Sequence, residues 1–160
     1  MRKIKITKNR YALVDDEDYE ILSKMKWHCH GKNGYFYAST YIDRKSILMH
    51  QFIVNPKNGY SVDHKNGNGL DNTKINLRVC SHGENMRNRK INRNNTSGYK
   101  GVWRNKSFLK KYTSEICING RKMHLGVFES LEEAAMAYDA AAIKYFGEFA
   151  RTNKSMGVLN

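Results

Sequence analysis

A carboxylate and an imidazole stand next to each other near the middle of the chain, and two carboxamides follow them. Asp63 and His64 end an apolar run, and a loop rich in glycine and asparagine comes directly after it. Asn76 and Asn85 stand further along the same stretch. Carboxylate and carboxamide oxygens that leave coordination positions open suit a hard divalent cation such as Mg²⁺. Asp63 and Asn85 are therefore a candidate metal pair.

Two strands and a short helix have to hold these residues. The run that ends at His64 predicts one strand, and a second strand opens at Asn76. A capping box at Ser81 and Glu84 predicts a short helix that carries Asn85. A hairpin followed by a helix brings the candidate metal pair together. For the Asp-His pair taken alone, an asparagine-rich turn with a surface histidine is the other interpretation.

In order, spacing and type, these four residues resemble the ββα-metal site of HNH endonucleases, with a close match to homing endonucleases of phage type. The resemblance covers about residues 48–90. It implies that Asp63 and Asn85 bind the metal, that His64 is the general base, and that Asn76 pins the hairpin and thereby orients the histidine. It also implies one bound Mg²⁺ or Mn²⁺ and no small-molecule cofactor.

The chemistry of those roles is consistent. A metal ion on the scissile phosphate and the leaving 3′ oxygen offsets the charge that builds in the transition state. A neutral imidazole near pH 7 takes a proton from the attacking water. A loop carbonyl fixed by Asn76 would accept a hydrogen bond from the other ring nitrogen of His64. We therefore expect metal-dependent hydrolysis of DNA phosphodiester bonds that leaves 5′-phosphate and 3′-hydroxyl ends, as in the family.

The neighbouring polar residues have weaker functional interpretations. Asp71 and Asn72 fit turn positions, with a place near the metal as the alternative for either. For His50 a packing role is favoured over a phosphate contact. Lys65 and Arg78 flank the site, where phosphate contacts and a solvated sheet face are equally good interpretations. The sulfur and imidazole groups that a zinc ion would need lack paired CxxC spacing, so we expect no structural zinc. These groups belong to His28, Cys29, His30, Cys80 and His82.

The charge of the chain favours a polyanionic partner. The 160 residues include 28 lysines and arginines against 15 acids, which gives a net charge of +13. The alternative is a solvated basic surface. One run without any acid is dense in basic residues, namely Arg87, Arg89, Lys90, Arg93, Lys100, Arg104, Lys106, Lys110 and Lys111. The polar middle of this run predicts a linker over residues 93–98, between a nuclease domain over residues 1–92 (core about 60–90) and a second domain over residues 99–160.

The last part of the chain has a clear strand and helix pattern. It predicts strands over residues 99–105, 112–118 and 122–128, with a hairpin turn at Asn119-Gly120. A capping box at Ser130 and Glu133 starts a helix that should end at Gly147. The motifs Gly98-Tyr99-Lys100-Gly101-Val102, Leu125-Gly126-Val127-Phe128 and Ala137-Tyr138-Asp139-Ala140-Ala141 resemble the AP2 DNA-binding domain.

That resemblance implies a three-stranded sheet in the major groove of DNA. The sheet residues that it places on DNA are Lys100, Trp103, Asn105, Cys117, Lys122 and His124. Arg104, Lys110 and Lys111 are expected phosphate contacts, and sheet packing is an equal alternative for Trp103. Together with the basic run and with Lys65 and Arg78, these residues form the expected DNA surface.

The sequence as a whole predicts an α+β protein. In the first part we expect strands at residues 4–6, 11–14, 35–41 and 46–49 and a helix over residues 15–25, with Tyr19, Leu22 and Met25 as its buried stripe. We expect double-stranded DNA as the partner, a monomer or weak dimer, no membrane span, and a cytoplasmic, phage-encoded protein. The alternatives are a non-cleaving DNA-binding regulator and an RNA-binding module.

Overall fold

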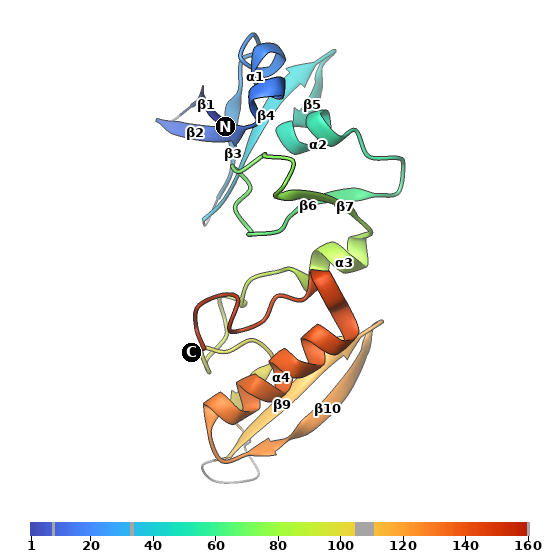
Figure 1. The fold of residues 1–160 in the computed structure, drawn as a ribbon. Coiled ribbons are helices and arrows are strands. Elements are labelled where there is room, and N and C mark those ends of the chain that lie inside the picture. Colours follow the sequence, from blue (N-terminus) through green and yellow to red (C-terminus); the bar gives the residue numbers. More distant parts are fainter. Residues whose placement is uncertain (8, 33, 105–110, 160) are drawn as a thin grey trace. The chain divides into compact units, whose positions relative to one another are not determined.

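The computed structural model describes residues 1–7, 9–32, 34–104 and 111–159. The chain forms two compact units, Met1–Asn85 and Met86–Asn160 (Figure 1). This division falls earlier than the expected linker at residues 93–98. That segment instead bonds to the second unit, because Ser97 Oγ donates to the Val102 carbonyl at 2.6 Å and Asn95 Nδ2 donates to the Tyr99 carbonyl at 2.8 Å.

The first unit is built from three small antiparallel sheets. Its strands are β1 (Arg2–Ile6) with β2 (Arg10–Val14), β3 (His28–Lys32) with β4 (Tyr35–Ile42) and β5 (Lys45–Leu48), and β6 (Ser61–His64) with β7 (Leu77–Cys80). Its helices are α1 (Asp16–Leu22), α2 (Met49–Val54) and α3 (His82–Arg87), whose last residues belong to the second unit. The α+β class is therefore confirmed, whereas β3 and α2 are elements that the sequence pattern did not predict.

Alternation of side chains explains the core of the first unit. Ile4 and Ile6 point inward from β1, and Ala12 and Val14 point inward from β2, because successive residues of a strand face opposite sides. Leu22 completes the same cluster from α1, with Tyr19 and Met25 packed against it as expected. The helix ends earlier than predicted, at Leu22. Trp27 Nε1 donates to the Leu22 carbonyl at 2.8 Å, which ties this end into the core.

The second unit is a three-stranded antiparallel sheet with one long helix. The sheet has the order β10-β9-β8, from β8 (Val102–Arg104), β9 (Tyr112–Ile118) and β10 (Arg121–Phe128). Helix α4 (Leu131–Phe146) lies across one face of the sheet and is followed by a short 3₁₀ turn, η1 (Gly147–Phe149) (Figure 1). None of the described helices has the length and apolar content that a membrane crossing requires.

Local sequence signals set the limits of these elements. Asn119 and Gly120 have φ values of 50° and 79°, which is the turn conformation that the hairpin needs. The Ser130 hydroxyl accepts from the Glu133 amide while the Glu133 carboxylate accepts from the Ser130 amide, so the predicted capping box is confirmed. The predicted end at Gly147 is confirmed as well.

The helix meets the sheet through small residues and one tyrosine. Ala134, Ala135 and Tyr138 are buried between α4 and the sheet. Gly101 has a φ of 76°, and a Cβ there would lie 2.0 Å from the Tyr138 ring, so this position requires glycine. Phe146 is buried near the end of α4, whereas the neighbouring Tyr145 is 39% exposed.

Candidate active site

The β6–β7 hairpin positions Asp63 and His64, the candidate metal ligand and the candidate base. Asp63 is the cross-strand partner of Arg78, and His64 is the partner of Leu77. His64 ends β6, so it stands at the point where the hairpin opens into the loop that leads to Asn76. Asp63 is 6% exposed and His64 is 5% exposed, so both side chains are buried.

Asn76 holds the two ends of that loop together. Its Oδ1 accepts from the Asn66 amide at 3.0 Å, and its Nδ2 donates to the Asp71 carbonyl at 2.7 Å. The Asn76 carbonyl also accepts from the Lys65 amide at 2.9 Å. The segment directly after His64 is thus fixed by a buried asparagine.

The second ring nitrogen of His64 faces Asn72. His64 Nε2 lies 3.4 Å from Asn72 Oδ1, and Asn72 is fully buried. The Asn72 backbone amide donates to the Leu13 carbonyl at 2.8 Å, so strand β2 holds this residue in place. Sequence reasoning favoured a turn position for Asn72, with a place near the metal as the alternative. It did not predict the contact with His64, because a residue held by a strand so far back in the chain leaves no local signal.

Two aromatic side chains pack against the His64 ring. The ring of His50 meets it edge to face, with centroids 4.7 Å apart and an interplanar angle of 87°. The Tyr37 ring lies 5.9 Å from His64 and 5.7 Å from His50. Helix α2 carries His50 and packs against β4, β5 and β6, which is why His50 meets the end of β6. We call Tyr37, His50, His64 and Asn72 the His64 nest.

Burial keeps both histidines neutral. Desolvation lowers the pKa of His64 below its usual value, although the hydrogen bond with Asn72 and the charges of Asp63 and Asp71 act in the opposite direction. Desolvation, aided by the charge of His64, lowers the pKa of His50 to about 3. At neutral pH the nest therefore contains two uncharged imidazoles.

The Asp63 carboxylate forms a buried ion pair with Arg78. Asp63 Oδ2 accepts from Arg78 Nε at 2.9 Å and from Arg78 Nη2 at 2.7 Å. The two side chains are only 7% and 10% exposed. Arg78, one of the expected phosphate contacts, is thus held by the candidate metal ligand in this structure. A cation that binds Asp63 has to compete with the guanidinium.

Asn85 stands on α3, directly after the hairpin. The Ser81–Glu84 capping box is confirmed, because the Ser81 amide donates to Glu84 Oε2 at 2.8 Å and the Glu84 amide donates to Ser81 Oγ at 3.3 Å. Asn85 is half-buried. The buried Cys80 thiol feels the charges of both Asp63 and Glu84, and desolvation is the first cause that raises its pKa to about 11. The carboxylates of Asp63 and Glu84 therefore both act on Cys80.

The donor chemistry of this site fits a hard cation. Asp63 supplies a carboxylate and Asn85 a carboxamide oxygen, which are the oxygen ligands that Mg²⁺ and Mn²⁺ take. The Cys80 thiol, which feels the charge of Asp63, is buried and has a raised pKa, so it stays protonated at neutral pH. It therefore provides no soft thiolate ligand. The residues at this site thus fit a magnesium or manganese ion.

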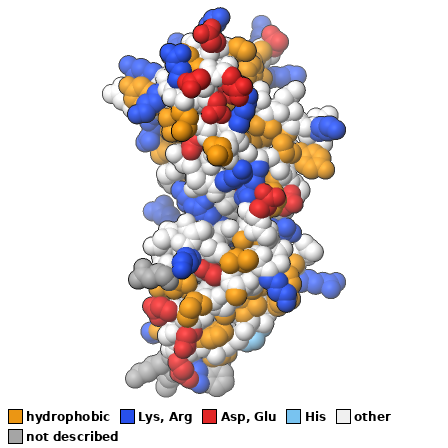
Figure 2. Space-filling model, viewed as in Figure 1, with side chains coloured by type: hydrophobic (Ala, Val, Ile, Leu, Met, Phe, Trp, Pro, Cys, Tyr) orange, Lys and Arg blue, Asp and Glu red, His pale blue; other side chains and the backbone are white. Residues whose placement is uncertain are grey.

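Most of the expected DNA contacts are exposed, and several of them also bond within the chain. Arg89, Lys90, Arg93, Trp103, Arg104, Lys122 and His124 are exposed, as is Lys65, whose Nζ donates to the Ile75 carbonyl at 2.8 Å. Lys111 pairs with Glu129 at 2.9 Å, and Arg87 Nη2 donates to Asn119 Oδ1 at 3.4 Å. Asn105 and Lys110 lie outside the described residues. On the face drawn in Figure 2, basic side chains are spread over both units.

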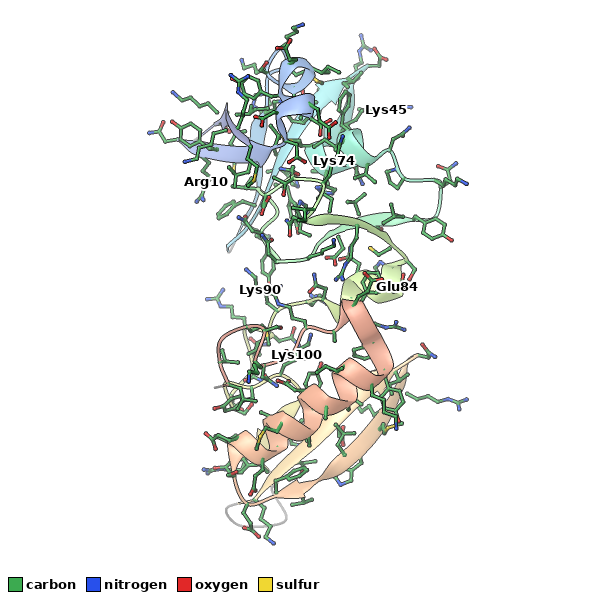
Figure 3. The ribbon with its side chains drawn as sticks, in the orientation of Figure 1. Arg10, Lys45, Lys74, Glu84, Lys90 and Lys100 are labelled. Atoms are coloured by element: carbon green, nitrogen blue, oxygen red, sulfur yellow. The ribbon has the colours of Figure 1, made fainter. Side chains whose placement is uncertain are left out.

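Lys100 has an internal role that sequence reasoning missed. Its Nζ donates to the carbonyl oxygens of Arg87 and Arg89 at 2.8 Å each and of Arg151 at 3.4 Å (Figure 3). Desolvation is the main reason that the pKa of this lysine falls to about 8. Lys100 therefore fixes the segment with Arg87 and Arg89 to the rest of the second unit. The Lys100 ammonium is bonded internally and is not part of the proposed DNA surface.

In the sheet of the second unit, the strand register places three of the expected DNA-contacting residues. Trp103 lies opposite Thr113, His124 opposite Glu115, and Lys122 opposite Cys117. Cross-strand partners share one face of a sheet. Val102 and Ile116 are buried on the α4 side, so Trp103 and Lys122 belong to the opposite, exposed face.

Comparison with known proteins identifies the family to which this chain belongs. The chain is 32% identical over 154 residues to an uncharacterized HNH endonuclease of Acanthamoeba polyphaga mimivirus, and the match covers 92% of this chain and 76% of that protein. This protein therefore belongs to the HNH endonuclease family. It is also 38% identical over 86 residues to an ethylene-responsive transcription factor of Medicago truncatula, a match that covers 52% of this chain and 31% of the plant protein. No family model matches the chain.

Proposed function

We propose that this protein is a divalent-metal-dependent DNA endonuclease with His64 as its general base and Asp63 and Asn85 as the ligands of one Mg²⁺ or Mn²⁺. The observation that carries the proposal is the environment of His64. This imidazole is buried beside a carboxylate, its pKa is lowered, and one of its nitrogens faces a carbonyl oxygen. A histidine in this state is available as a base at neutral pH.

The protonation of His64 follows from the contact with Asn72. An amide oxygen accepts a hydrogen bond, so it favours the tautomer with the proton on Nε2 and leaves a lone pair on Nδ1. His64 Nδ1 takes a proton from the attacking water. The charges of Asp63 and Asp71 then stabilise the imidazolium. Asp63 and Asn85 would hold the cation, which when bound would supply Lewis-acid stabilisation of the charge on the phosphate.

Asn76 and Arg78 have supporting roles in this proposal. Asn76 keeps the loop after His64 in one conformation, so the histidine does not have to be ordered during the reaction. Arg78 keeps the Asp63 carboxylate in place before the metal binds. Once released, its guanidinium is free to contact a phosphate.

The second unit is the proposed DNA-reading part. Support comes from the exposed sheet face with Trp103, Lys122 and His124, and from the similarity to a plant transcription factor. A sheet of this kind fits the wide major groove of double-stranded DNA. We propose a site-preferring, homing-type enzyme that acts in the cytoplasm. A single HNH site cuts one strand at each visit, so a monomer nicks.

Metal add-back to supercoiled plasmid tests this function. The protein is stripped with EDTA and then given Mg²⁺, Mn²⁺ or no metal. Conversion of supercoiled to open-circular plasmid only with added metal is the expected result. A protein that shifts the plasmid in a gel but never opens it would be a DNA-binding regulator, the candidate that the transcription-factor similarity favours.

A further inference from the structure

His50 is the part of the His64 nest that packing does not explain. The residue is 5% exposed, and its Nδ1 has no hydrogen-bond partner among the described residues. A phenylalanine would fill the same space without leaving a buried polar atom unpaired, and an unpaired polar atom destabilises a fold. An exception of this kind in a native structure needs a reason outside packing.

A second unpaired polar atom lies in the same nest. Asn72 is fully buried, its Oδ1 faces His64, and its Nδ2 lacks a partner in the described part of the chain. Both residues contact the His64 ring, one edge to face at 4.7 Å and the other through the 3.4 Å pair. An amide nitrogen donates and an unprotonated imidazole nitrogen accepts. One orphan atom can thus accept from a water molecule and the other can donate to one, and a buried water needs at least two polar partners.

We propose that His50 is a positioning residue for His64, and that its Nδ1 forms, together with Asn72 Nδ2, a water-binding position inside the nest. This inference rests on the proposed role of His64 as the base. Burial keeps His50 uncharged at neutral pH, so it adds no repulsion when His64 takes a proton. Its ring, with that of Tyr37, limits the motion of the His64 ring.

Two variants distinguish the effect of the ring nitrogens of His50 from the effect of its ring shape. His50→Phe keeps an aromatic ring and removes both nitrogens, whereas His50→Asn keeps a polar atom near the position of Nδ1. We expect single-turnover nicking by His50→Phe to fall by about 10- to 100-fold, in line with the effect of a misplaced catalytic group. The dissociation constant of this variant for DNA should not change, and its melting temperature should stay the same or rise.

Two further variants serve as rescue and control. His50→Asn should recover part of the nicking rate. His30→Gln, at an exposed histidine of the same unit, should behave as wild type.

A spectroscopic measurement on the metal-free protein tests positioning without any reaction. The ring nitrogens of His64 are followed by long-range ¹H–¹⁵N NMR at neutral pH. We expect one tautomer, protonated on Nε2, in the wild type and a mixture of tautomers in His50→Phe. Wild-type nicking by His50→Phe, an unchanged His64 spectrum, or failure of this variant to fold would overturn the inference. If the wild type does not nick at all, the proposed function fails and the spectrum alone decides the role of His50.

Discussion

Two opposing influences act on the pKa of His64: burial lowers it, and three neighbouring polar groups raise it. Burial is the first cause and lowers it, while the hydrogen bond with Asn72 and the charges of Asp63 and Asp71 partly offset this effect. The same carboxylates that favour protonation stand ready to stabilise the imidazolium once it forms. A base that is neutral at rest and stabilised after proton transfer suits hydrolysis at neutral pH.

The buried His50 makes stability depend on acid pH. Above pH 6.5 both the folded and the unfolded protein carry this histidine neutral, so the linkage is absent. Below pH 6.5 only the unfolded chain takes up the proton, because the folded pKa is about 3. Between pH 6.5 and pH 5 this should remove about 2 kcal/mol from the free energy of unfolding. Urea titrations at both pH values should show a smaller loss for His50→Phe, and an equal loss in both proteins would refute this.

Removal of Arg78 should expose the competition for Asp63. In Arg78→Gln the Asp63 carboxylate stays buried without its cation, so the metal-free protein should lose about 3–5 kcal/mol of stability. Mn²⁺ should then raise the melting temperature of the variant more than that of the wild type, because no guanidinium has to be displaced. Melting curves with and without Mn²⁺ measure both effects. Lys57→Gln, at an exposed lysine of the same unit, is the control, and equal Mn²⁺ shifts in all three proteins would speak against the competition.

At the scale of elements, the loop between β6 and β7 is held from both sides. Asn76 bonds to the start of the loop at Asn66 and to its middle at Asp71. Lys74 anchors the loop to α1 through Glu17 at 2.7 Å and Asp18 at 3.5 Å (Figure 3). The acidic start of α1, which suits the positive end of a helix dipole, is thus also the anchor of the active-site loop.

Loss of the Asn76 side chain should loosen this loop. Asn76→Ala removes two hydrogen bonds and leaves the Asn66 amide without its acceptor, so stability should fall by about 1–3 kcal/mol. Nicking should fall as well, because the segment after His64 is no longer fixed. Denaturation curves and nicking rates measured beside Asn58→Ala, at an exposed asparagine, check this. The idea fails if Asn76→Ala keeps wild-type stability and rate.

Elements with local signals were predictable, and contacts between distant segments were not. The turn at Asn119-Gly120 and the capping boxes at Ser81 and Ser130 each depend on neighbouring residues, and all are present. Strand β3 escaped prediction because its sequence, His-Cys-His-Gly-Lys, has no apolar alternation. The His64 nest escaped it because β4, α2 and the hairpin loop supply its members from separate parts of the chain.

At the scale of the whole molecule, the chain joins a unit that contains the candidate active site to a unit with an exposed sheet face. The similarity to an HNH endonuclease covers most of the chain, while that to a plant transcription factor covers about half of it. Lys100 ties the basic segment after α3 to the second unit, so this segment is not a free tether. The family could be inferred from four residues. A linker could not be told from an ordered loop at residues 93–98, because polar asparagines serve both equally well.

The exposed sheet face should account for part of the salt dependence of DNA binding. Lys122→Gln removes one exposed cation from that face, so the slope of log affinity against log salt should become shallower by about 0.9. Lys144→Gln, at an exposed lysine on α4, removes the same charge on the helix side and should leave the slope unchanged. Fluorescence anisotropy over a salt series measures both. Identical slopes for Lys122→Gln and the wild type would remove this face from the interface.

The role of His64 is tested most directly by single-turnover nicking of supercoiled plasmid in Mg²⁺. His64→Ala is compared with His82→Ala, which removes an exposed histidine from α3. Loss of a general base should lower the rate of His64→Ala by about 10²- to 10⁴-fold, while His82→Ala keeps a rate near that of the wild type. Equal nicking by His64→Ala and the wild type would contradict the assignment of the base.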